Sequence, residues 1–388
     1  MRSFGGGVSV GLLVVACAGG AFMACSSDDE GTPGTADAGQ ETTTTPESST
    51  PDTAPVDTGA DVEVEPPFDC TQESAVELPE HLRCTGLYDK WTKKQVATGV
   101  KEFAPAYTFW SDGAVKRRWI YLPPGQKIDT SKFDAWVFPV GTKLWKEFVI
   151  DGKHVETRLF WKIATSTWAR TTYQWSADES EAKRLDTGFT KNDPKDPAAS
   201  GYEIPAVAKC DQCHNGSADK VLGFEAVGLG LPGATGYTLD MLVADGRLTD
   251  PPPNAAGLKP SIPDDGKGSK NALGWLHANC GLACHNTLPT ANCQFRMMFL
   301  KLSYAEVTSG LAVDKTDTYT TTVNVASLLP GGGGYVRIAP GNVANSAVHY
   351  LPNHRDNTSP TGQMPPIATH KIDPTGVGYL STWIGALQ

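Results

Sequence analysis

Two cysteines and a histidine in the stretch "KCDQCHNG" have the spacing of a covalent cofactor site. Cys210 and Cys213 are separated by two residues, and His214 directly follows the second cysteine. Two thiols at this spacing can form thioether bonds with the vinyl groups of a porphyrin, and the adjacent histidine then lies beneath the iron as an axial ligand. The pattern therefore predicts a covalently bound c-type heme at this turn.

A second cluster, "HANCGLACHN", repeats the arrangement with one more residue between the thiols. Cys284 and His285 are adjacent, so the placement of the iron ligand is preserved, whereas the bond from Cys280 must span a longer loop. Gly281 is the residue type that allows a backbone bulge in that loop. We expect a second heme here. An alternative keeps one thioether at Cys284 and joins Cys280 to Cys293 in a disulfide.

A structural zinc site is the rival interpretation of the two clusters, because paired cysteines also have the spacing of zinc ligands. Zinc, however, gives no reason for a histidine directly after the second cysteine of each cluster. Short-range disulfides would be strained and would also leave the histidines unexplained. The zinc ligands would be Cys210, Cys213, Cys280 and Cys284.

A low-spin heme that transfers electrons needs a second axial ligand, usually methionine or histidine. Met364 stands in the polar stretch "PTGQMPPIATH", where two following prolines stiffen the loop, and we predict that it binds the iron at His285. For the heme at His214 the first choice is Met241 in "GYTLDMLVADGRL", a stretch that also has the pattern of a short amphipathic helix. Four histidines stay open as alternatives: His277, His349, His354 and His370.

The start of the chain has the order of an export signal, with Arg2 before an apolar run and small residues at its end. The run is too short and too rich in glycine for a comfortable membrane span. Residues 1–25 resemble a bacterial lipoprotein signal, which implies lipidation of Cys25, with Cys17 as the alternative. We expect an exported lipoprotein that faces the periplasm or the cell surface, anchored by its lipid, most naturally in the outer membrane.

Residues 26–66 consist mainly of Thr, Pro, Ser, Gly, Asp and Glu, which offer almost nothing to bury. Such a composition predicts a disordered, acidic tether. The whole chain has 33 basic and 43 acidic residues; residues 1–66 hold one of the former and 11 of the latter, which leaves 32 of each. The remainder has no net charge that would attract nucleic acid.

Residues 67–200 are rich in tryptophan and in strand patterns. Eight of the ten tryptophans fall in this region, and "RRWIYLP", "AWVFP", "LWKEFVI" and "HVETRLFWKI" read as strands. The Asp151–Gly152 pair predicts a hairpin turn between the last two. We expect a small antiparallel sheet or sandwich. Tryptophans in strands are more often core residues than a platform for a carbohydrate or quinone, so a small-molecule ligand is the less favoured alternative.

Free thiols in an exported protein tend to be oxidised. Cys70 and Cys84 bracket "TQESAVELPEHLR" and form the natural disulfide pair, although a sequence cannot fix connectivity.

Two helices are expected around the second cluster. "KNALGWLHANC" has apolar residues at helical spacing, and "DPTGVGYLSTWIGAL" begins with the start signal Asp373–Pro374. Gly274 and Gly378 would allow these helices to approach each other closely.

The stretches "VAKCDQCHNG", "LGWLHANCGLACHN" and "APGNVANSAVHYLPNHRDNTSPTGQMPPIATHKIDPTGVGYLSTWI" resemble the exported two-heme c-type cytochromes, over about residues 85–388. The resemblance implies a β-rich N-terminal region and electron transfer through two covalent hemes. The extra residue after Cys280 departs from the family pattern and puts the first thioether of that site in doubt. The residues that carry the resemblance to the site are Cys210, Cys213, His214, Cys280, Cys284, His285 and Met364.

The expected fold is a multidomain α+β protein. A β domain (67–200) would precede two mainly helical, cytochrome c-like modules (201–265 and 266–388), the second with a strand-rich insertion near 312–340. The expected function is to carry single electrons between redox partner proteins. Two alternatives remain: a peroxidase-like heme enzyme with one open iron site, and a heme-free zinc-binding or adhesin-like protein.

Overall fold

The computed structural model describes residues 68–73, 78–190, 201–252, 259–291, 293, 296–328, 334–355 and 362–388. The predicted signal peptide and tether, with Cys17 and Cys25, lie outside these residues. The described residues form a mixed α and β fold, which confirms the prediction at that level. Within them, no helix is both long and apolar enough to cross a membrane.

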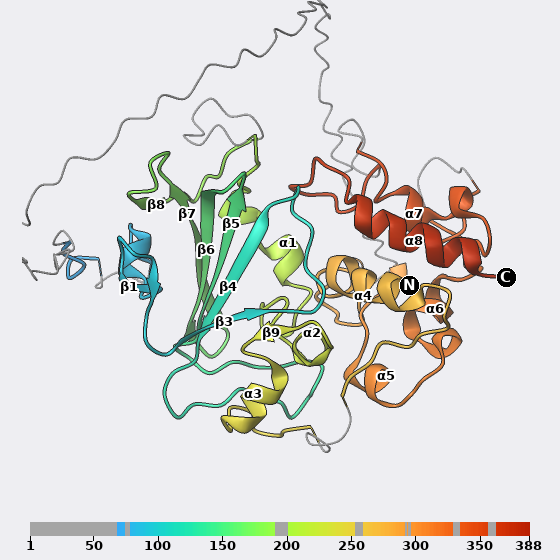
Figure 1. The fold of residues 1–388 in the computed structure, drawn as a ribbon, viewed down its shortest axis with the longest axis horizontal. Helices are drawn as coiled ribbons and strands as arrows, with labels where there is room; N and C mark the ends of the chain where they lie inside the picture. The colour runs from blue at the N-terminus through green and yellow to red at the C-terminus, as the bar shows by residue number, and fades with distance from the viewer. Residues whose placement is uncertain are drawn as a thin grey trace, which may run out of the picture. The chain divides into compact units, whose positions relative to one another are not determined.

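A seven-stranded antiparallel sheet in the order β8-β7-β6-β5-β4-β3-β9 is the largest element (Figure 1). The predicted strands within 117–123, 144–150 and 154–163 are confirmed, and Asp151 and Gly152 form the turn with positive φ angles of 49° and 79°. "AWVFP" forms only an isolated bridge. The strands are β3 (Val100–Ala104), β4 (Val115–Tyr121), β5 (Lys143–Ile150), β6 (Lys153–Ala164), β7 (Thr167–Trp175), β8 (Ala182–Arg184) and β9 (Thr235–Gly236).

The strand alternation gives the sheet two unlike faces, because successive residues point to opposite sides. The tryptophan face is defined by the buried side chains of Trp119, Trp145, Leu159, Tyr173 and Trp175. It packs against a small two-stranded sheet, β1 (Tyr88–Lys90) and β2 (Gln95–Val96). The expected disulfide between Cys70 and Cys84 is present and has a Cα–Cα distance of 5.4 Å. Cys84 is the last residue of the short 3-10 turn Leu82–Cys84, and Leu82 of this turn is buried in the core of the tryptophan face.

The basic face is the opposite side of the same strands and is defined by Arg118, Lys146, Arg158 and Phe160, which lie in matching register. Figure 1 shows α1 on the side of the sheet away from β1. The helices of the chain are α1 (Asp211–His214), α2 (Ala226–Gly230), α3 (Leu239–Ala244), α4 (Ser269–Leu276), α5 (Tyr304–Thr308), α6 (Asp317–Thr322), α7 (Ala347–Tyr350) and α8 (Pro374–Ala386).

The two predicted helices are α4 and α8, and they pack together in one apolar core. Asp373 caps α8 by accepting hydrogen bonds from the backbone N–H groups of Thr375 and Gly376. The close approach is made by Gly376 rather than by the glycines predicted for it. A Cβ on Gly376 would lie 2.0 Å from the Trp275 indole nitrogen, whereas one on Gly274 would meet the ring of Tyr107.

Residues 312–340 differ from the predicted strand-rich insertion. The threonine-rich part forms α6, and the described residues after it make only isolated bridges. The Thr316 hydroxyl caps α6 by accepting from the Tyr319 N–H. The hydroxyls of Thr321 and Thr322 donate to carbonyls one turn earlier. Threonine favours strands through its branched side chain, but these local hydrogen bonds satisfy its hydroxyl within a helix.

Candidate functional site

The first cysteine–histidine cluster forms the single-turn helix α1, which lies against the basic face. The His214 ring stacks on Phe160 of β6, with ring centroids 4.2 Å apart and an interplanar angle of 24°. Its Nδ1 lies 2.5 Å from the carbonyl oxygen of Lys220, to which it donates. Burial lowers the pKa of His214 to about 4, so the ring is neutral. A neutral imidazole that donates through Nδ1 keeps the Nε2 lone pair for a metal.

The second cluster continues α4 through a single π turn, His277–Gly281. The His285 N–H donates to the carbonyl of Cys280, 2.9 Å away and five residues earlier, so the extra residue between the thiols is absorbed as a π bulge. Gly281 is needed for close packing: its Cβ would lie 2.4 Å from the backbone nitrogen of Lys301. His285 is buried, and among the described residues its Nδ1 has no hydrogen-bond partner.

The two clusters, far apart in the sequence, are packed against each other. A Cβ on Gly216 would lie 1.9 Å from the Ala283 carbonyl oxygen, so only glycine fits there. The Asn286 side chain donates to the Gly216 carbonyl at 3.0 Å. The Cys284 thiol donates to the Gln212 carbonyl, 4.0 Å away and next to Cys213 in the first cluster. The cysteine spacing within each cluster did not predict this contact. The sequence shows only that Asn215 and Gly216 follow the first histidine and that Asn286 follows the second.

The five thiols in and beside the clusters are all free. The disulfide considered between Cys280 and Cys293 is therefore not formed, and Cys293 instead hydrogen bonds with Cys284 and His285. Hydrogen bonding from Cys284 lowers the pKa of Cys213 to about 7, and burial raises that of Cys280 to about 12. Within the described part of the chain, no three His, Cys, Asp or Glu side chains are arranged to hold a bare metal ion. The rival zinc site thus lacks a preformed ligand set.

The methionines predicted as axial ligands have different surroundings. Met364 is half-buried in the loop before α8, and its N–H donates to the Leu351 carbonyl at 3.1 Å. Met241 lies on α3, the predicted amphipathic helix, with 45% of its surface exposed. A ligand in a closed heme pocket would be buried, so this exposure does not favour Met241.

The four histidines left open as alternative ligands all have partners. His277 and His370 lie beside carboxylates, and His349 and His354 beside a hydroxyl and a carbonyl. The contacts are His277 with Glu225 (3.4 Å), His370 with Glu203 (2.6 Å), His349 with Ser381 (2.9 Å) and His354 with the Tyr350 carbonyl (3.0 Å).

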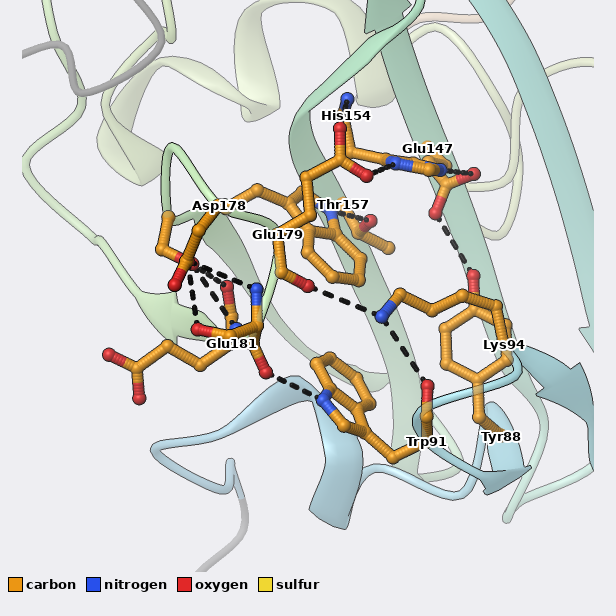
Figure 2. Close-up of polar contacts among 12 residues, drawn as sticks. Tyr88, Trp91, Lys94, Glu147, His154, Thr157, Asp178, Glu179 and Glu181 are labelled. Carbon is orange, nitrogen blue, oxygen red and sulfur yellow. Dashed lines mark hydrogen bonds and ion pairs between the residues drawn. The ribbon is translucent and has the colours of Figure 1, made fainter. Parts of the chain in front are cut away.

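A second polar cluster lies on the tryptophan face, where His154 is held between two carboxylates (Figure 2). Its Nε2 is 3.3 Å from Glu147 and its Nδ1 is 2.7 Å from Glu179. Hydrogen bonding to Glu147 raises the pKa of His154. The fully buried Glu147 also accepts from the Tyr88 hydroxyl at 3.0 Å.

A pocket of about 410 Å³ beside this cluster is lined in part by Trp91, Lys94 and Glu179. Trp91 is 7% exposed, stacks on Trp175, and has Lys94 over its ring at 4.4 Å. Its ring faces are covered, so Trp91 is a core residue here and not a platform for a sugar or quinone.

No family model, curated protein or solved structure matches this chain. The site is therefore interpreted from its own residues. The sequence missed one part of it, a row of cations on the basic face, because each of them looked like the solvent side of a strand. The signal was present in the sequence: Lys116 and Arg118 alternate along one strand, and Lys146 and Arg158 lie on the next two strands.

Proposed function

We propose that this protein is an exported electron carrier that binds two c-type hemes, one at Cys210–His214 and one at Cys280–His285. The observation that carries the proposal is the pairing of the two clusters. Two turns, each with free thiols and an adjacent histidine, pack directly against each other through Gly216 and Ala283. Neighbouring attachment points favour electron transfer from one heme to the other.

The residues of both turns suit a heme. When bound, it supplies a one-electron iron couple, whose potential depends on axial ligation and burial. His214 donates its Nδ1 hydrogen to the Lys220 carbonyl, which fixes the ring and directs Nε2 outward. His285 is buried and directly follows Cys284, so a heme held at that thiol would have this ring beneath its iron. The thioethers would form at Cys210, Cys213, Cys280 and Cys284.

Met364 is the proposed second ligand at His285, because its loop is held by Leu351 and two prolines. The exposure of Met241 favours a second candidate function at the other site. There, an iron at His214 without a sixth ligand would bind a small substrate, and the protein would be a peroxidase-like enzyme. An open iron site gives a high-spin spectrum in the resting protein, whereas two six-coordinate hemes of a pure carrier do not.

The test is heme stoichiometry, measured by intact mass and pyridine hemochrome absorbance after expression with a cytochrome c maturation system. We expect two hemes in the full chain and one in each of the double variants C210A/C213A and C280A/C284A. Cys293→Ala, which removes a neighbouring thiol outside both motifs, is the matched control and should retain two. A wild-type protein without heme would overturn the proposal, and a single heme would restrict it to one cluster.

We also propose that the chain is a lipoprotein anchored through Cys25, with the outer membrane as its site. This rests on the sequence of residues 1–25 and the tether that follows. Cys25→Ser should release the protein from the membrane fraction, with Cys17→Ser as the matched control. The reverse result would move the lipid to Cys17.

A further inference from the structure

The basic face brings three like charges into one row across the sheet. Arg118 of β4 lies directly opposite Lys146 of β5, and Lys146 lies opposite Arg158 of β6. Lys116, two residues before Arg118, shares the same face. Like charges directly opposite each other destabilise a sheet, so such a row requires compensating anions.

The chain supplies anions for some cations of this face and not for others. Arg118 is 4% exposed, and within the described residues its Nη2 has no hydrogen-bond partner. Lys146 likewise forms no ion pair in the described part of the chain; its ammonium lies only over the rings of Phe109 and Phe148. The paired cations are Arg158 with Glu156 (2.5 Å), Lys162 with Asp219 (2.6 Å) and Arg170 with Asp211 (2.6 Å).

A buried cation without an anion is costly, because desolvation is not repaid by Coulomb attraction. Burial lowers the pKa of Arg118 to about 10, which expresses the same cost. Arg118 is such a residue, and the half-buried Lys146 beside it has no ion pair among the described residues. In a sheet that otherwise pairs its buried charges, the two indicate that an anion outside this chain completes the row.

The row begins at the first cysteine–histidine cluster and runs away from it. The His214 ring stacks on Phe160 of β6, two residues from Arg158 on the same face. Lys146 lies on the next strand, β5, and Arg118 on the one after it, β4. Arg118 is two strand spacings from Arg158, or about 10 Å. The cation on the strand that His214 contacts, Arg158, is therefore already paired, whereas Lys146 and Arg118 lie on the next two strands.

This order matches the chemistry of a heme held by its vinyl groups. The two propionate carboxylates project from the porphyrin edge opposite the vinyl-bearing edge, so a heme attached at one end of the row presents anions toward the other end. We propose that Arg118 and Lys146, with Lys116 behind them, bind the propionates of the heme at Cys210–His214. The assignment rests on the proposed function, because it requires a heme at that cluster.

The experiment compares adjacent residues on opposite faces of one strand in the heme-loaded protein. Arg118→Gln and Lys146→Met remove charge from the row, and Arg117→Gln removes it from the tryptophan face, where Arg117 pairs with the exposed Glu102. Loss of a nearby cation favours the ferric state. We expect a redox titration to show the equilibrium of one heme shifted about tenfold toward ferric, which is about 59 mV for one electron. Arg117→Gln should leave both potentials unchanged.

Two further measurements make the outcome decisive. The charge-conserving variants Arg118→Lys and Lys146→Arg should restore the potential. The propionate bending band in the resonance Raman spectrum should move in Arg118→Gln and in Lys146→Met but not in Arg117→Gln. The C280A/C284A background, which keeps only the first heme, assigns the shift; if that background does not fold, exactly one of the two potentials should shift in the two-heme protein.

The assignment is overturned if the protein carries heme but Arg118→Gln and Lys146→Met behave like Arg117→Gln, or if the heme at His285 is the one that responds. A wild-type protein that carries no heme contradicts the proposed function itself. The two failures are thus told apart by the heme content of the wild-type protein, which is measured first.

Discussion

On the tryptophan face of the sheet the buried Glu147 lies between the Tyr88 hydroxyl and the His154 ring. On the basic face Arg118 and Lys146 lie opposite each other, and neither pairs with an anion from the described residues. The same strands build both faces, so the difference does not come from the sheet itself. Where a buried charge meets a partner from its own chain, the group serves stability. Where it does not, we propose that a ligand supplies the anion, and the first cysteine–histidine cluster lies on that side.

The largest expected effect comes from a cation of the basic face that is already paired. Lys162 is 1% exposed and lies 2.6 Å from the buried Asp219. Lys162→Met leaves that carboxylate buried without its cation, which should lower the free energy of unfolding by about 3–5 kcal/mol. Urea denaturation measures it. If Lys162→Met lowers the free energy of unfolding as little as Arg117→Gln does, the distinction between paired and unpaired cations fails.

A smaller effect is expected from the disulfide beside the tryptophan face. Cys70 and Cys84 are 14 residues apart, so opening the bond releases a loop of that length in the unfolded chain. The double variant C70A/C84A should lose about 3 kcal/mol of unfolding free energy while it keeps both hemes. Reduction should lower the free energy of unfolding of the wild-type protein by the same amount and leave that of the variant unchanged. Loss of heme in the variant would show that the two faces are not independent.

The histidine of the tryptophan face should give a pH-dependent contribution to stability. The pKa of His154 is raised above its ordinary value of about 6.5, first by Glu147 and then by Glu179. Its contribution is therefore complete below that ordinary value and is lost as the pH rises through the raised one. The free energy of unfolding, measured across this pH range, should fall with rising pH in the wild-type protein and change less in His154→Gln. Equal slopes would remove His154 as the cause.

The smallest effect is expected at the exposed ion pair of the tryptophan face. The side chains of Arg117 and Glu102 are 43% and 47% exposed, so water screens their attraction. Arg117→Gln should change the free energy of unfolding by less than about 1 kcal/mol. Thermal denaturation beside Arg118→Gln checks this, and a larger loss would disqualify Arg117→Gln as the control for the basic row.

Much of the local structure followed from the sequence. The Asp151–Gly152 hairpin, the capped helix α8 and the amphipathic helix α3 were predicted and are present. The errors came where a local preference competed with other contacts. Threonines favoured strands near 312–340, yet their hydroxyls are satisfied within α6. Gly274 was predicted to allow the close approach of α4 and α8. The neighbour that fills the space at Gly274 is instead Tyr107, which comes from a distant part of the chain.

The sequence by itself determined that each cluster has a histidine directly after a thiol pair, because adjacent residues fix this arrangement without any tertiary contact. Only the tertiary structure decided that Gly216 packs on Ala283 and that Arg118, Lys146 and Arg158 share a row. Strand register sets which residues face each other, and it depends on pairings between segments that spacing along one segment does not encode. The uncompensated charge of the basic face is therefore a property of the fold.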